Sequence, residues 1–199
     1  VDSKTGANLF MRASPAAGAT PAHAQYTLSE IGEHYLAGLL AHARGMTAFC
    51  TPTINGFGRF RPNALAPQAI LWGRDNRGAM LRVVGQCDDK GTRIENRLGE
   101  PAANPYLYLA SQIHAGLDGI TRRLKAPPAT DAPYGGGAEK IPTSLGEALE
   151  ALKADAVFTA GFGDTFINCL THIKQAEIKR HDDAEDKDDW QRREYFSRI

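Results

Sequence analysis

The chain has 199 residues, of which 42% are hydrophobic and 23% are charged, an ordinary composition for a globular protein with a sizeable core. Twenty-three Lys and Arg residues balance 23 Asp and Glu residues, and this zero net charge argues against a nucleic-acid-binding or membrane-surface protein. Three widely spaced cysteines without a CxxC pair argue against a disulfide scaffold and a zinc site, and no apolar run is long enough to span a membrane. We therefore expect a cytoplasmic protein whose important charges act locally.

The first part of the chain is expected to be a loop followed by a long helix. Residues 11–25 are rich in Ala, Pro and Gly, which favours a surface loop. The chain starts on Val1 in a turn-like segment, so we expect the natural protein to extend upstream. Thr27 and Glu30 form a capping-box pattern that predicts a helix, and apolar residues then recur at helical spacing as far as Met46.

Three strands are predicted in the middle of the chain. A turn-rich segment over residues 53–67 precedes them, and it is long for a structureless connection, which indicates a functional loop. Alternating or apolar patterns then predict strands over 69–73, 79–84 and 92–98.

Helices are predicted for most of the remainder. Asn104 can cap a helix that has Pro105 at its first position and runs to Leu124. Ser144 begins a short helix, Asp164 caps another, and a final short helix ends the chain. The order of elements predicts the α+β class, with long helices flanking a mostly antiparallel sheet.

Basic side chains are concentrated between Asn55 and Arg97. This stretch has one lysine and four acids beside its seven arginines, so it carries a charge of about +4 within a neutral chain. Guanidinium groups are costly to bury without an anionic partner, and they bind carboxylates and phosphates through two parallel hydrogen bonds. The excess charge therefore predicts a site for such anions. The seven are Arg59, Arg61, Arg74, Arg77, Arg82, Arg93 and Arg97.

The last predicted strand places an acid between two of these arginines. Side chains alternate along a strand, so Arg93, Glu95 and Arg97 share one face. Neighbouring positive charges keep a carboxylate ionised, and an ionised carboxylate can ligate Mg²⁺ bound with nucleotide phosphates. The alternative is a solvated basic strand with surface ion pairs, and the spacing alone leaves both interpretations open.

Several longer motifs occur in a fixed order along the chain: LSEIGEHYLAGLLAHA (28–43), PTINGFGRF (52–60), WGRDNRGAMLRV (72–83), RIENR (93–97) and PAANPYLYLA (101–110). Over nearly the whole chain, their order and spacing resemble the glutamine synthetase family. The pattern is most similar to members that make γ-glutamylamides or γ-glutamylanilides. Several separate motifs are more specific than one, so the resemblance favours the anion site over the solvated strand.

The resemblance implies an architecture and an assembly. Residues 1–199 would be the C-terminal part of a catalytic domain whose curved, mostly antiparallel sheet lines the active site, a fold shared with guanido kinases. The N-terminal β-grasp domain and the early catalytic strands would precede Val1. Family members form homo-oligomers, typically a double-ring dodecamer, in which a neighbouring subunit completes each active site. This fragment alone is then expected to be inactive.

The resemblance also implies an ATP-dependent ligase with small-molecule substrates. The γ-carboxylate of glutamate attacks the γ-phosphate of ATP, and an amine or ammonia captures the γ-glutamyl phosphate. By position in the motifs, Arg59 and Arg97 would contact glutamate, and Arg77 would stabilise the phosphoryl group during transfer.

The remaining implied roles concern the nucleotide and the metal. Arg82 and Arg93 would contact ATP, and Glu95 would ligate a divalent ion, Mg²⁺ or Mn²⁺. These implied anions, ATP and glutamate, agree with the excess of positive charge in the same stretch.

One position departs from the ammonia-using members. After the first arginine these have a VPGYEAP-type loop whose glutamate takes a proton from ammonium, whereas here the loop reads RPNALAP (61–67) and Leu65 stands at that position. Leucine cannot accept a proton but can pack against an apolar substituent, so we expect an alkylamine or arylamine donor. A true glutamine synthetase using ammonia, a non-catalytic relative that binds ATP or another anion, and a guanido-kinase-like phosphotransferase remain alternatives.

Some other residues are given ordinary roles. Trp72 is expected in the core, and the helical histidines are expected to be core or surface residues and not metal ligands. Tyr134 lies near the position where some bacterial members carry an adenylylated tyrosine, but its glycine-rich surroundings differ, which disfavours the same regulation.

Overall fold

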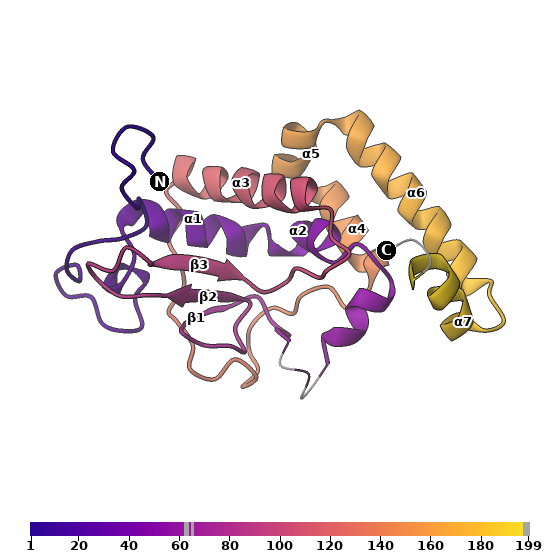
Figure 1. The fold of residues 1–199 in the computed structure, drawn as a ribbon, viewed down its shortest axis with the longest axis horizontal. Coiled ribbons are helices and arrows are strands. Elements are labelled where there is room, and N and C mark those ends of the chain that lie inside the picture. Colours follow the sequence, from indigo (N-terminus) through magenta and orange to yellow (C-terminus); the bar gives the residue numbers. More distant parts are fainter. Residues whose placement is uncertain (62–63, 65, 197–199) are drawn as a thin grey trace.

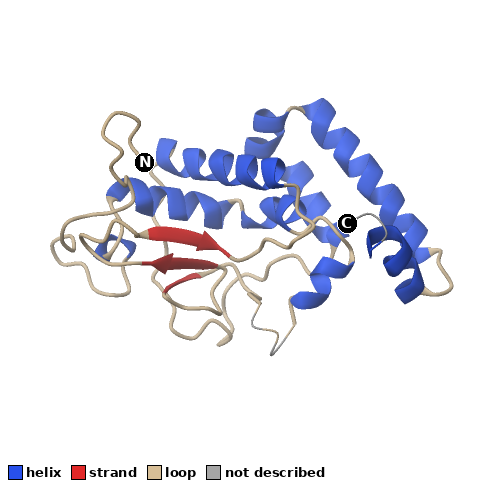
Figure 2. Ribbon diagram, viewed as in Figure 1, coloured by secondary structure: helices blue, strands red, loops and turns tan. Residues whose placement is uncertain are grey.

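A computed structural model describes residues 1–61, 64 and 66–196. A layer of helices covers one face of a small sheet, and further helices extend from one end of this body (Figures 1 and 2). Among the described residues, no helix is long and apolar enough to cross a membrane. The helical elements are η1 (Ala24–Tyr26), α1 (Glu30–Ala41), α2 (Ala43–Cys50), η2 (Asn55–Arg59), α3 (Pro105–Thr121), α4 (Leu145–Ala154), α5 (Ala156–Phe162), α6 (Asp164–Asp182), α7 (Lys187–Gln191) and the π-helical turn η3 (Arg192–Phe196).

The first long helix differs from its prediction at its start and in its middle. The side chain of Ser29 caps α1 by accepting a hydrogen bond from the Gly32 amide at 3.0 Å, so the predicted cap at Thr27 is wrong. The hydroxyl of Ser29 also donates to the carbonyl oxygen of Leu9 at 2.5 Å. This second hydrogen bond connects the N-terminal segment to the helix cap. The helix is then interrupted at His42, which separates α1 from α2.

The three predicted strands are present but shorter, as β1 (Trp72–Arg74), β2 (Leu81–Val84) and β3 (Arg93–Asn96). The α+β class is confirmed. The described sheet is mixed, however, because β1 pairs with β2 in parallel and β2 pairs with β3 antiparallel. Asp75, just after β1, has a left-handed φ of 48°. The loop that follows returns to the start of β1, so that β2 runs parallel to β1 with Leu81 beside Trp72. The predicted, mostly antiparallel curved sheet is thus not confirmed by these strands.

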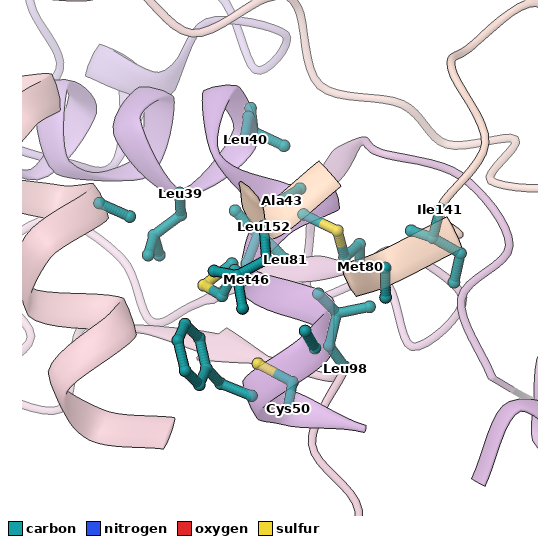
Figure 3. Packing of buried hydrophobic residues seen from close by; sticks show 14 of the residues in the cluster. Leu39, Leu40, Ala43, Met46, Cys50, Met80, Leu81, Leu98, Ile141 and Leu152 are labelled. Carbon is teal, nitrogen blue, oxygen red and sulfur yellow. The ribbon is translucent and has the colours of Figure 1, made fainter. Parts of the chain in front are cut away.

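The two faces of the sheet have different surroundings. Trp72, Leu81 and Val83 are almost completely buried, and Trp72 is the core residue that the sequence predicts. Strand alternation directs Arg82 to the opposite face, where it lies beside Glu95 in the strand register. Figure 3 shows Leu81 packed among Leu39, Met46 and Leu98 in the core. Helix packing therefore fixes the strand that carries Arg82.

The helices of the second half confirm some predicted ends and correct others. Asn104 caps α3 with Pro105 in its first turn, and Ser144 caps α4, as predicted. The helix α5 was not predicted from the sequence. Asp164 is the first residue of α6 and not its cap, which is Gly163. The helix α6 continues to Asp182, and most of the charged residues in its second half are exposed to solvent.

Candidate active site

The centre of the candidate site is an ion pair between neighbouring strands. Arg82 of β2 donates from Nη1 to Oε2 of Glu95 on β3 at 3.0 Å. Its Nε donates to Oδ1 of Asp75 at 3.0 Å, and its Nη2 also contacts this oxygen. The hydrogen bond to Asp75, and after it the one to Glu95, raises the pKa of Arg82. The guanidinium is thus held in a fixed orientation on the sheet face.

Glu95 also lies close to a second arginine. Nε of Arg97 is 3.6 Å from Oε1 of Glu95, which is within ion-pair range but too long for a hydrogen bond. The main-chain amide of Arg97 donates to the Met80 carbonyl at 2.9 Å, which continues the alignment of β3 beyond its end. Arg82 and Arg97 therefore flank the carboxylate; strand alternation indicates Arg93 and Arg97, and of these two described residues only Arg97 is found in contact with Glu95.

Arg59 joins this group through the main chain. It ends η2, and its Nη1 and Nη2 donate to the carbonyl oxygens of Gly99 and Arg97 at 2.5 and 2.6 Å. Burial lowers the pKa of Arg59, while the nearby Glu100 carboxylate opposes this shift. The structure thus brings Arg59, Arg97, Glu95 and Arg82 into one connected group.

The position of η2 depends on contacts with the C-terminal helices. The hydroxyl of Tyr195 accepts a hydrogen bond from the Ile54 amide at 2.9 Å and donates to Oε1 of the buried Glu177 at 2.5 Å. On the other side, Thr53 donates through Oγ1 to Oε1 of Glu100 at 2.7 Å. The sequence did not predict these positioning residues, because they are far along the chain from the segment that they hold: Tyr195 and Ile54 are 141 residues apart.

Arg93 lies at the other end of β3 beside a large hollow. Its Nη1 donates to the carbonyl oxygen of Gly91 at 3.1 Å, and its side chain is exposed. A cavity of about 750 Å³ lies between this strand end and the N-terminal loop, and Lys90 also lines it. Asn8 holds the loop in place by donating to the carbonyl oxygens of Lys90 and Thr92 at 3.1 and 2.6 Å. Lys90 was not among the predicted site residues.

Arg77, like Arg93, has no hydrogen bond or ion pair with this group among the described residues. Arg77 lies exposed in the loop between β1 and β2 and makes no hydrogen bond or ion pair with any described residue. The ring of Tyr134 lies over Gly78 in this loop, because a Cβ atom added there would be 3.0 Å from the Tyr134 hydroxyl. Leu65 lies outside the described residues.

Comparison with known proteins identifies the family. Residues 9–195 match the model of the glutamine synthetase catalytic domain. The chain belongs to the glutamine synthetase family. It is 41% identical to the gamma-glutamylanilide synthase of an Acinetobacter species, over 100% of this chain and 40% of that protein. It is 37% identical to a gamma-glutamylethanolamide synthetase of Streptomyces coelicolor (86% of this chain, 37% of that protein). For a glutamine synthetase of Thermus thermophilus the identity is 38%, over 81% of this chain and 37% of that protein.

The fold of the chain also matches solved structures of GmaS. The chain superimposes on GmaS in complex with ADP with a TM-score of 0.75 and 31% identity, over 98% of this chain and 44% of that chain. The corresponding values for GmaS without ligand are 0.75, 33%, 97% and 42%. The chain thus spans about two fifths of the length of the curated relatives it matches.

The donor set on the sheet fits part of a divalent metal site. Oε2 of Glu95 accepts a hydrogen bond from Arg82, whereas Oε1 is only in long-range ion-pair contact with Arg97 and can still act as a ligand. A carboxylate oxygen suits Mg²⁺ or Mn²⁺. Within residues 1–61, 64 and 66–196, no group of three His, Cys, Asp or Glu side chains could hold an ion.

Proposed function

We propose that this chain is the C-terminal part of the catalytic domain of an ATP-dependent ligase that joins glutamate to an amine. The proposal rests above all on the pairing of Glu95 with Arg82 and Arg97, and on the binding of Arg59 to the main-chain carbonyl of Arg97. The 41% identity to a gamma-glutamylanilide synthase supports the product class. In the intact protein, a β-grasp domain and further strands would complete a curved, mostly antiparallel sheet.

The positive groups serve two substrates in this proposal. Arg82 contacts the phosphates of ATP, and Arg93 contacts the nucleotide in the cavity at the start of β3. Arg59 and Arg97 hold the glutamate. The side chain of Arg59 is held by main-chain carbonyl oxygens, and the main chain of Arg97 is held by the hydrogen bond that its N–H donates to the Met80 carbonyl. Positive groups that are already held in place reduce the reorganisation of the site that phosphoryl transfer from ATP to glutamate requires.

Arg77 acts at the transferred phosphoryl group. Its side chain is exposed and without a partner among the described residues, so its charge is available for the developing negative charge on the phosphoryl oxygens.

A divalent ion would complete the phosphate site. Glu95 is the ligand that this chain supplies, and Mg²⁺ or Mn²⁺ would neutralise phosphate charge and orient the transferred group. The remaining ligands would come from segments that these residues do not include.

The nitrogen donor is an organic amine in this proposal. Leu65 follows Arg59 by six positions in the sequence and stands where ammonia-using members have a glutamate; a leucine there favours an alkyl or aryl substituent on the amine, and the product is a γ-glutamylamide. The identity to glutamine synthetases supports ammonia as a second candidate donor.

We further propose a cytoplasmic homo-oligomer, a double-ring dodecamer with small-molecule substrates. The proposal is supported by family membership. Regulation by modification of Tyr134 has no support beyond the exposure of this side chain.

A phosphate-release assay on the intact protein tests the ligase reaction. Release from ATP should require glutamate and a nitrogen donor together. Stabilisation by ATP without turnover would indicate a non-catalytic relative, and a stable phosphorylated product without an amine would indicate a phosphotransferase.

The variant Glu95→Gln tests the metal ligand in the same assay. We expect the Mg²⁺ concentration for half-maximal rate to rise at least about tenfold, because an amide is a weaker ligand than a carboxylate. Asp88→Asn is a matched control, because Asp88 has a left-handed φ of 59° that Asn tolerates and lies in the turn before β3. An unchanged Mg²⁺ requirement for Glu95→Gln would contradict the assignment.

A further inference from the structure

The loop that carries Arg77 is held by hydrogen bonds on its N-terminal side. The amide of Gly78 donates to Oδ1 of Asn76 at 3.0 Å, which closes a tight turn around Arg77. Nδ2 of Asn76 donates to the carbonyl oxygen of Thr130 at 3.1 Å and so connects this turn to a distant segment. The side chain of Arg77 is exposed and makes no hydrogen bond or ion pair with any described residue. The main chain of the turn therefore decides where Arg77 lies.

A second turn packs against the C-terminal side of the same loop. A main-chain hydrogen bond of 3.0 Å closes residues 132–135 into a β-turn with Pro133 and Tyr134 at its centre. A Cβ atom added at Gly78 would lie 2.6 Å from Cγ of Pro133 and 3.0 Å from the hydroxyl oxygen of Tyr134. Both rings therefore lie directly against the main chain one residue after Arg77.

This β-turn is connected to the buried part of the sheet. Trp72 of β1 is 1% exposed, and its Nε1 donates to the carbonyl oxygen of Pro127 at 2.7 Å. The amide of Thr130 donates to the main-chain carbonyl oxygen of Trp72 at 3.0 Å. Oγ1 of Thr130 then accepts a hydrogen bond from the Ala132 amide at 3.1 Å. The packing of Trp72 in the core therefore sets the position of the β-turn.

We propose that residues 132–135 position Arg77 for phosphoryl transfer, and that Tyr134 is a positioning residue which acts through Arg77. This inference rests on the proposed role of Arg77 at the transferred phosphoryl group. Hydrogen bonds hold the main chain before Arg77, at Asn76, and the two rings hold it after Arg77, at Gly78. A displacement of about 1 Å at a catalytic group can slow a reaction about a hundredfold. Contacts on both sides of Arg77 restrict such a displacement.

The kinetics of Tyr134 variants of the intact protein test this role. Tyr134→Ala removes the ring, and we expect kcat to fall at least about tenfold while the KM values for ATP and glutamate change less than about twofold, because Arg77 acts only on the transferred group. Tyr134→Phe keeps the ring and should retain at least about half of kcat. Tyr106→Ala is the matched control, because Tyr106 is 82% exposed on α3. An unchanged kcat in Tyr134→Ala, or no rescue by phenylalanine, would overturn the role.

Gly78→Ala changes the same contact from the other side. Its Cβ atom would displace the Pro133 ring, so we expect the same fall in kcat with little change in either KM. Gly78 has no left-handed φ, so the main chain itself tolerates alanine. Gly146→Ala is the control, because its nearest neighbour is the Ser144 hydroxyl at 3.8 Å. A normal kcat in Gly78→Ala would contradict the proposal.

Limited proteolysis by trypsin tests the contact without any ligase activity. Cleavage needs the main chain to open locally, so Tyr134→Ala should be cleaved after Arg77 at least about fivefold faster than the unmodified protein, as followed by peptide mass spectrometry. Cleavage after Arg123, which is exposed in the turn after α3, should stay the same. Equal cleavage after Arg77 in the two proteins would overturn the proposal. Faster cleavage with an unchanged kcat would confirm the contact and contradict the catalytic role of Arg77.

Discussion

His42 is a charged residue in the helical layer, at the interruption between α1 and α2. Its Nδ1 lies 2.7 Å from Oδ2 of Asp155, and its Nε2 lies 2.9 Å from Oδ2 of Asp118. Burial lowers the pKa of His42, but the two carboxylates outweigh this effect and raise it above its ordinary value. Arg122 also pairs with Asp118, at 3.0 Å. Both ring nitrogens of His42 thus face carboxylates, and the imidazolium connects the junction of α1 and α2 to Asp118 of α3 and to Asp155, which caps α5.

Replacing His42 should make stability less dependent on pH. Because the folded-state pKa is raised, the stabilisation is fully present below the unfolded pKa of about 6.5 and is lost as the pH rises through the folded value. We expect His42→Gln to lower the free energy of unfolding by about 1–3 kcal/mol at pH 6 and by less at pH 9. Urea unfolding at the two pH values measures this, and an equal loss at both would contradict the charged state.

At the scale of elements, α1 and α3 approach closely through glycines. A Cβ atom added at Gly119 would overlap the carbonyl oxygen of His34, and one added at Gly38 would lie 2.9 Å from the Cα of Gly119. These neighbours are main-chain atoms in packed helices and cannot move independently. The pair of glycines therefore sets the distance between α1 and α3.

Gly119→Ala should destabilise the protein by about 1–3 kcal/mol through overpacking at this crossing. Gly146→Ala is the matched control, since Gly146 lies in α4 and its nearest neighbour is the Ser144 hydroxyl at 3.8 Å. The control should be neutral or stabilising by about 0.5–1 kcal/mol, because alanine favours helices. Thermal unfolding compares the two, and equal effects would argue against the close contact.

The hydroxyl of Tyr195 connects the C-terminal helices to the segment that carries Arg59. Tyr195→Phe would leave the Ile54 amide and Glu177 without this partner, at a cost of about 1–3 kcal/mol. If Arg59 binds glutamate, the KM for glutamate should rise while the KM for ATP changes little. Tyr106→Phe is the control, because Tyr106 is 82% exposed. Equal changes in both KM values would count against this role.

The elements show what local patterns could predict. Asn104 and Ser144 were recognised as caps because capping depends on neighbours within one helical turn. Strand alternation predicted that Arg93 and Glu95 share a face, which the register confirms, whereas the pair between Arg82 and Glu95 depends on the pairing of two strands and was not predicted. The interruption at His42 was not predictable, because Asp155 is 113 residues away, and the parallel pairing of β1 depends on a single left-handed residue, Asp75.

At the scale of the whole molecule, a neutral chain concentrates positive charge on the strands and loops of a small sheet. Part of this charge is already used: Arg82 binds two carboxylates, and Arg59 binds carbonyl oxygens. Counting charges in the sequence could not distinguish these arginines from Arg77, whose side chain has no partner among the described residues. The chain spans about two fifths of the length of its curated relatives.

The choice of nitrogen donor tests the central claim most directly. With glutamate and ATP, the intact protein is assayed for ADP release with ammonia, alkylamines and arylamines at equal concentrations of free base. We predict the highest kcat/KM with an alkylamine or arylamine, and a shift of at least about tenfold towards ammonia in Leu65→Glu, which introduces a proton acceptor. The highest kcat/KM with ammonia in the unmodified protein would contradict the account.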